Sequence, residues 1–186
     1  VKLGAEGYGY VGFSLSVVQY LIIIVDFGFN LSATKRIAVV ANDRIALSHV
    51  FWNVVAAKLL LMFLTTLALL ILVVCIPTFR LYGNAIIATY PMLLGSALTF
   101  IWFFQGIGRI RLFSIMNTVS KIALLPLIFV FIQSPDDYVV AALLQAVVFV
   151  STAIISNIYV ARQRLVEWIR PTWKLVKEEL HVSFPL

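Results

Sequence analysis

Long apolar runs separated by short polar links dominate the pattern of the chain. Each run approaches or exceeds the length of about 20 residues that an α-helix needs to cross about 30 Å of hydrocarbon. Lipid offers the backbone no hydrogen-bond partner, so runs of this kind predict helices rather than open strands. We expect five membrane-spanning helices, at residues 10–29, 50–76, 85–104, 112–132 and 138–161.

The links between these runs differ in charge. Ten lysines and arginines lie in the links at residues 30–49 and 105–111 and in the tail after residue 161, against two in the other links. Cytoplasmic links carry the excess of positive charge in membrane proteins, which puts these three segments in the cytoplasm. Residues 162–182 then form a basic cytoplasmic linker toward a next span. Their mixture of tryptophans and cations suits either an amphipathic segment on the membrane surface or a solvated linker.

The composition is that of a membrane protein. Hydrophobic residues make up 62% of the chain and charged residues 12%, whereas a soluble domain has about twice that charged fraction. The net charge of +6 does not indicate nucleic acid, because the cations lie between apolar runs rather than on one domain. The expected fold class is therefore all-α, a polytopic transmembrane helix bundle.

Both ends of the printed sequence suggest a segment of a longer protein. The first residue is not methionine, and the last four, Ser183–Leu186, look like the start of another apolar run. We expect residues 1–186 to contain about five complete spans, with further helices missing at both ends.

The end of the first run holds an unusual acid. Asp26 still has apolar neighbours, and the cations Lys35 and Arg36 follow it. We expect the two cations to reach the headgroups on the cytoplasmic side. A carboxylate within a turn or two of that interface is costly unless it faces water or a cation.

Two lysines lie inside apolar runs. Lys121 is near the middle of its run, where a charged lysine costs about 2.5–3.5 kcal/mol on insertion scales. It is too deep to extend to either surface, so we expect it to face a cavity, to pair with an acid or to be neutral. Lys58 is closer to the cytoplasmic end and can extend to the headgroups. Asp26 can pair with either lysine, and such a structural ion pair is the alternative to a substrate role.

Each run also carries a sparse polar stripe at helical spacing. In the first run the stripe is Ser16, Gln19, Asp26 and Asn30, and residues three or four apart share one face of a helix. Five such faces could enclose a common wet interior. The alternative for any single serine or threonine, which we favour, is a bond to a carbonyl group of its own helix.

Two prolines predict bends in the spans. Pro91 and Pro126 each remove a backbone donor from the third and fourth runs, which leaves a carbonyl without its helical partner. Pro126 lies just over one turn after Lys121, so we expect Lys121 to lie beside a bend.

The residue pattern does not indicate an enzyme, a cofactor or a metal site. The glycines near the N-terminus do not follow a strand, as a phosphate-binding loop requires. His49 and His181 are far apart, and Cys75 lies alone inside an apolar run, so no disulfide framework or metal-ligand spacing is present.

Two motifs resemble one family. Asp26-Phe-Gly-Phe-Asn-Leu-Ser-Ala-Thr-Lys35 closes the first run, and Trp102-Phe-Phe-Gln-Gly-Ile107 closes the third. Together they resemble the Wzx-type O-antigen and polysaccharide flippases of the multidrug/oligosaccharidyl-lipid/polysaccharide exporter superfamily. One position departs from the family, because Gly108 stands where an acid is common, although Arg109 keeps the base that follows it. An acid–base pair at that corner is therefore not expected.

The resemblance implies a two-lobe transporter of about twelve to fourteen helices, of which this chain would supply most of the first six-helix lobe. Such proteins move an undecaprenyl-pyrophosphate-linked oligosaccharide across the bacterial inner membrane by alternating access. The implied partners are this lipid-linked oligosaccharide and membrane lipids, with a polysaccharide polymerase as an open candidate and no nucleic acid.

The resemblance also suggests roles for particular residues. A multiply anionic cargo needs cations in the cavity, and lysine is a compact point charge for phosphate. We expect Lys121, helped by Lys58, to attract the pyrophosphate or acidic sugars, and Asp26 to balance these cations or carry a coupling proton. The remaining candidates are amides that bind glycan hydroxyls and cations that act as a cytoplasmic gate or anchor: Asn117, Gln145 and Gln19, and Lys35, Arg36 and Arg109.

Two other function classes stay open. A cation-coupled drug or metabolite antiporter of the same superfamily would present intramembrane acids, whereas this chain has two deep lysines against one acid. A membrane scaffold that transports nothing would use the lysines in structural pairs.

Overall fold

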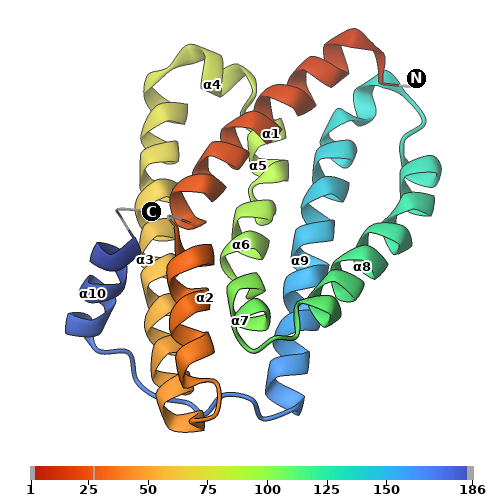
Figure 1. Ribbon diagram of the computed structural model, residues 1–186. Coiled ribbons are helices and arrows are strands. Elements are labelled where there is room, and N and C mark those ends of the chain that lie inside the picture. Colours follow the sequence, from red (N-terminus) through yellow and green to blue (C-terminus); the bar gives the residue numbers. More distant parts are fainter. Residues whose placement is uncertain (1–2, 27, 184–186) are drawn as a thin grey trace.

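A computed structural model describes residues 3–26 and 28–183, and this part of the chain is all-α. Figure 1 shows a bundle of long helices whose connections lie at its two ends. Five helical segments are long and apolar enough to cross a membrane, which confirms the predicted fold class and the predicted number of spans. The chain is a multi-pass membrane protein. The predicted entry into a further span lies almost wholly outside the described residues.

The helices follow one another along the chain with short connections. In order they are α1 (Gly4–Asp26), α2 (Phe29–Val40), α3 (Arg44–Cys75), α4 (Pro77–Leu81), α5 (Gly83–Thr89), α6 (Pro91–Ala97), α7 (Ile101–Gly106), α8 (Ile110–Phe131), the 3₁₀ turn η1 (Pro135–Asp137), α9 (Tyr138–Arg162) and α10 (Trp173–Ser183).

The first span differs from its prediction. Gly28 takes a left-handed backbone conformation (φ +78°), which glycine adopts without steric cost, and a second helix, α2, begins at once. Most of the predicted link at residues 30–49 is therefore helical, with only residues 41–43 between α2 and α3. Lys35 and Arg36 lie on α2 rather than in a loop.

The second span is one long helix. The side chain of Asp43 caps α3 by accepting the backbone N–H groups of Ile45 and Ala46, each at 3.0 Å. The helix then runs for 32 residues, a length of about 48 Å, which exceeds the about 30 Å of hydrocarbon. Polar residues such as Ser48 hid its first turns from hydropathy. Pro77 lies just past its end.

The third span is interrupted twice. Pro91 starts α6 directly after Tyr90, as its missing N–H predicts. A second break, at residues 98–100, separates α6 from α7 and contains neither glycine nor proline. In the fourth span, Pro126 stays inside α8, and Figure 1 shows that helix bent.

Small residues set the closest helix approaches. A Cβ atom built on Gly95 of α6 would lie 2.6 Å from the backbone carbon of Phe149 on α9. One built on Gly106 of α7 would lie 2.5 Å from the Cγ2 atom of Ile37 on α2. Glycine is therefore required for these helices to pack as they do. An aromatic cluster fills the space beside α7, built from Phe51, Phe100, Trp102, Phe103 and Phe104.

The tail after α9 is bound to the bundle. We call residues 163–172 the strap. Ser48 accepts the backbone N–H of Glu167 at 2.9 Å, and Trp52 donates to the carbonyl of Glu167 at 2.8 Å. Further along, Asn53 accepts the N–H of Thr172 at 3.1 Å. All three partners are on the first turns of α3.

Helix α10 then packs against α2 and α3. Val176 is buried there, Ser183 shares a hydrogen bond of 2.7 Å with Ser32, and Glu179 pairs with Arg36. Val176 and Leu180 of α10 thus pack against the bundle, whereas Trp173 and Val182 are exposed. Hydrogen bonds and the packing of α10 hold this segment on α2 and α3, and its role as a basic cytoplasmic linker toward a next span stays a prediction.

Glu179 is a buried acid in this interface. Its side chain is fully buried, and this burial raises its pKa from the ordinary value of 4.5 to about 6, although the Arg36 guanidinium opposes the rise. Burial of a carboxylate disfavours its charged form. The acid therefore docks at lowest cost when it is protonated.

We expect Gly106→Ala to lower the stability of the bundle, because the added methyl group overlaps the side chain of Ile37. Overpacking of this kind costs about 1–3 kcal/mol, measurable as a lower thermal unfolding temperature in detergent. Gly12→Ala is the control: no atom lies within 4 Å of that Cβ position, so the variant should be at least as stable as wild type. Equal unfolding temperatures for both variants would contradict the close contact.

We expect the docked α10 to become more stable as the pH falls through about 6 toward about 4.5. The folded-state pKa of Glu179 is the higher one, so its contribution is complete below about 4.5 and is lost as the pH rises through about 6. Thermal unfolding at pH 5 and pH 7.5 measures the effect. The same difference in Glu179→Gln should be smaller, and an unchanged difference would assign the pH dependence to other groups.

Candidate functional site

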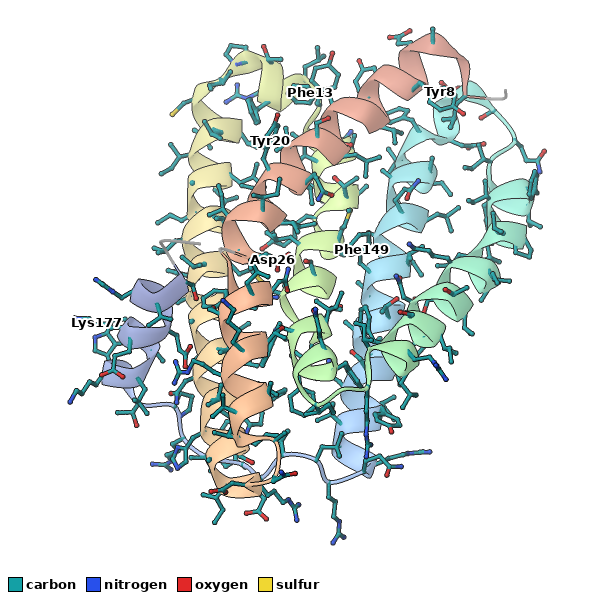
Figure 2. The ribbon with its side chains drawn as sticks, viewed as in Figure 1. Tyr8, Phe13, Tyr20, Asp26, Phe149 and Lys177 are labelled. Atoms are coloured by element: carbon teal, nitrogen blue, oxygen red, sulfur yellow. The ribbon has the colours of Figure 1, made fainter. Side chains whose placement is uncertain are left out.

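A buried ion pair joins α1 and α3. The Nζ atom of Lys58 lies 3.0 Å from Oδ1 of Asp26 and donates to the backbone carbonyl of Ser96 at 3.3 Å. The side chain of Lys58 is 1% exposed, whereas that of Asp26 is 28% exposed. Figure 2 shows Asp26 near the middle of the bundle, where α1 ends and α2 begins.

Two helix breaks make this position favourable for a cation. Asp26 is the last residue of α1, and Ser96 lies in the last turn of α6. The carboxyl ends of helices carry partial negative charge and unpaired carbonyl groups. The ammonium group of Lys58 therefore meets one carboxylate and the ends of two helices, which offsets part of the cost of its burial.

Other side chains bond carbonyl groups at the second break. Thr99 donates to the carbonyl of Gly95 at 2.6 Å, and Asn157 of α9 donates to that of Leu98 at 2.9 Å. Thr34 of α2 reaches the carbonyl of Trp102 at 3.2 Å, at the start of α7. Together with Lys58 of α3, side chains from three other helices, α2, α3 and α9, thus donate hydrogen bonds to the interrupted backbone of the third span.

The structure brings together Asp26 and Lys58, the structural ion pair that the sequence left open. The position of Lys58 in its run suggested that its side chain could extend to the headgroups. Its ammonium group instead binds Asp26 and the carbonyl of Ser96 inside the protein. Lys121 is exposed on α8 and is not part of this pair. The two lysines therefore have different surroundings.

Lys121 lines a cavity of about 660 Å³ between α1, α8 and α9. Gln145 of α9 lines the same cavity, together with Thr118 and Tyr8. The rest of the lining is apolar and includes Phe149, which Figure 2 shows between α6 and α9. None of the described residues that line it is acidic. The cavity thus combines one cation and one amide with a hydrocarbon-like wall.

The other candidate residues lie elsewhere. Asn117 is half-buried one turn before Lys121, and Gln19 is exposed on α1, and neither lines that cavity. Lys35 is exposed, Arg36 binds Glu179, and Arg109 donates to the hydroxyl of Tyr159 at 3.2 Å. The predicted residues therefore divide into several separate groups.

The hydroxyl groups of the polar stripes bond mainly within their own helices. Most of the stripe serines and threonines bond carbonyl groups three or four residues earlier on their own helices: Ser16, Thr65, Thr89, Thr99, Ser114, Thr152 and Ser156. This is the alternative that we favoured from sequence. Such local bonds satisfy the hydroxyl groups without water.

Sequence reasoning missed the second break and its partners. Residues 98–100 hold no proline or glycine, so no local signal marks them. Because the helix is interrupted there, the carbonyl of Ser96 can accept a hydrogen bond from Lys58, and that of Leu98 can accept one from the side-chain amide of Asn157. The pairing of Arg36 with Glu179 was also missed, because 143 positions separate them and charges in a basic tail carry no periodic signal.

The two motifs that suggested a family meet in space. Helix α2 carries most of the first motif and packs on α7, which carries most of the second, through Gly106 against Ile37 and Thr34 against Trp102. Residues 2–186 match the sequence model of a protein family that is described as "Polysaccharide biosynthesis protein". The chain belongs to this family.

Two curated proteins that are similar to this chain carry the name "Putative O-antigen transporter". The protein from Escherichia coli (strain K12) is 31% identical over 144 residues, which is 77% of this chain and 35% of that protein. The protein from Shigella dysenteriae is 30% identical over 161 residues, 87% of this chain and 40% of that protein. The matched part of the chain thus spans less than half the length of either relative. No solved structure matches the chain.

We expect the Asp26–Lys58 pair to show strong coupling in a double-mutant cycle. Asp26→Asn leaves a buried ammonium group without its counter-ion, a loss of about 3–5 kcal/mol. Lys58→Met should cost less, because the remaining carboxylate is partly exposed. The double variant should be more stable than the sum of the two losses predicts, and thermal unfolding of all four proteins measures this. Additive losses would show that the two groups do not interact.

Proposed function

We propose that the protein carrying this chain is a flippase for a lipid-linked oligosaccharide. The observation that carries the proposal is the cavity between α1, α8 and α9, in which Lys121 and Gln145 face a largely apolar lining. Such a cargo has an anionic pyrophosphate, a polar glycan and a long hydrocarbon chain. One cation, one amide and an apolar wall are groups that these three parts would contact.

In this proposal Lys121 attracts the pyrophosphate. A point charge in a low-dielectric cavity acts on an anion more strongly than it would in water, and the cavity contains no acidic side chain from the described residues to neutralise it. Gln145 donates to glycan hydroxyls beside it. Asn117, one turn away on α8, and Gln19 on α1 are proposed to meet the glycan as it moves.

The Asp26–Lys58 pair has a second proposed role, in conformational change. Alternating access requires an element that has two arrangements, and interrupted helices supply such elements in transporters. The pair holds the ends of α1 and α6 together at 3.0 and 3.3 Å. Protonation of Asp26 or approach of an anion to Lys58 would weaken this link, which makes the pair a candidate for coupling.

The family membership and the names of the relatives support transport rather than catalysis. We propose the bacterial inner membrane as the location and undecaprenyl pyrophosphate as the lipid carrier. A polysaccharide polymerase would consume the flipped unit and is the protein partner that this function implies. Lys35, Arg36 and Arg109 are proposed to anchor the basic end of the bundle on the cytoplasmic side.

An antiporter for cationic drugs is less well supported. Such a protein needs an intramembrane acid that is free to bind the drug, whereas Asp26 is engaged by Lys58. A scaffold that transports nothing would have no use for a lysine in an apolar cavity to which the described residues contribute no acid. Both alternatives predict that a host without any copy of the gene keeps its normal surface polysaccharide.

We expect Lys121→Ala to reduce surface polysaccharide at least tenfold without loss of membrane-inserted protein. The full-length gene and its variants are returned to a host that lacks its own copy, and polysaccharide ladders are compared alongside a blot of the membrane fraction. Lys174→Ala, which removes an exposed cation of α10, is the matched control and should restore wild-type ladders.

Restoration by both variants would remove Lys121 from the proposal while keeping the transport function. Loss of the ladder together with loss of inserted protein would assign Lys121 a structural role. A normal ladder in the host without any copy of the gene would overturn the flippase function itself.

A further inference from the structure

A second hollow lies at the basic end of the bundle, away from the Lys121 cavity. Its volume is about 320 Å³. The turn between α2 and α3, the turn between α7 and α8, and the strap all contribute to its wall. The lining residues are Ala41, Asn42, Arg44, Leu47, Phe103, Ile107, Arg109, Arg164 and Leu165.

Three arginines from three separate segments converge on this hollow. Arg44 is the first residue of α3, Arg109 precedes α8, and Arg164 belongs to the strap. None of the described residues that line the hollow is acidic. Like charges around so small a space repel one another, and an anion bound among them would lower that repulsion.

Two acidic residues lie near these arginines, but neither lines the hollow. Glu167 lies 3.4 Å from Arg44, but both side chains are about half exposed, and exposed pairs of this kind are weak. Asp43 is adjacent and exposed, and its carboxylate accepts two backbone N–H groups of α3. Arg109 donates to Tyr159, which is neutral.

The backbone at Arg164 supports a functional reason for an arginine there. Its φ angle is +46°, the one positive φ of a non-glycine residue in the described part of the chain. That conformation disfavours side chains with a Cβ atom, and glycine would make the same turn without strain. A strained residue of this kind is a pointer to function. An arginine stands at this turn in place of glycine, and it lines the hollow.

We propose that this hollow binds a phosphate-bearing headgroup. Guanidinium groups match phosphate oxygens with paired hydrogen bonds, which makes arginine the preferred residue for such anions. Basic hollows at the cytoplasmic side of membrane helices bind lipid headgroups in this way. Leu47, Phe103 and Leu165 add an apolar floor beside the arginines. The proposal does not depend on the transported cargo.

The ligand can be a soluble phosphate or an anionic lipid, and two probes distinguish them. Purified full-length protein is titrated with inorganic pyrophosphate in detergent. In parallel, lipids that remain bound are counted by native mass spectrometry after release from nanodiscs that contain phosphatidylglycerol and phosphatidylcholine. The variants are Arg44→Gln, Arg109→Gln and Arg164→Gly.

Arg164→Gly is the most informative variant, because it removes the charge and relieves the backbone strain together. We expect it to unfold at the same or a higher temperature than wild type while it weakens anion binding at least tenfold. Arg80→Gln is the control, since Arg80 is a single arginine beside a hollow at the opposite end of the bundle. This control should bind like wild type.

The possible outcomes distinguish a soluble phosphate from a lipid headgroup, and both from failure of the proposal. Pyrophosphate binding that is lost in the three variants identifies a soluble phosphate site. Selective retention of phosphatidylglycerol, lost in the same variants without pyrophosphate binding, identifies a lipid headgroup site. Equal binding of both probes by wild type, Arg164→Gly and Arg80→Gln would overturn the proposal, as would a lack of binding by wild type.

Discussion

Backbone carbonyl groups at interrupted helices are the constraint on which this bundle depends. The first and third spans both break within the protein, and each break leaves polar groups that lipid cannot bond. The carbonyl of Ser96 is bonded by Lys58 and that of Leu98 by Asn157. Because these donors come from α3 and α9, the same bonds that satisfy the breaks also hold separate helices together.

The ion pair of Asp26 and Lys58 follows from the same constraint. A lysine that is 1% exposed would be costly to bury alone, and here it meets a carboxylate and two helix ends. An intact buried pair adds little net stability, whereas the loss of one partner is costly because it leaves a buried charge alone. The position of this pair at both breaks makes it the point where a change in charge would alter helix geometry.

Tight packing and a bound strap organise the basic end around these breaks. Gly106 lets α7 approach α2, and the strap is hydrogen-bonded to the first turns of α3. Arg44, Arg109 and Arg164 come from different parts of the chain but line one hollow because of this packing. The cationic groups are therefore distributed by depth: a paired lysine within the bundle, Lys121 in a lateral cavity, and three arginines at the end.

The sequence by itself determined the membrane class, the number of spans and the identity of the unusual residues. Hydropathy depends on local composition, and a charged residue in an apolar run is conspicuous wherever it lies. The partner of Lys58, the break at residues 98–100 and the docking of α10 were decided only by tertiary structure. Each depends on which distant helix supplies a donor, an acid or an apolar face, and no local pattern records that choice. Lys121 is an example. The sequence predicted that it faces a cavity, pairs with an acid or is neutral, and only the packing of α1, α8 and α9 placed it beside a cavity.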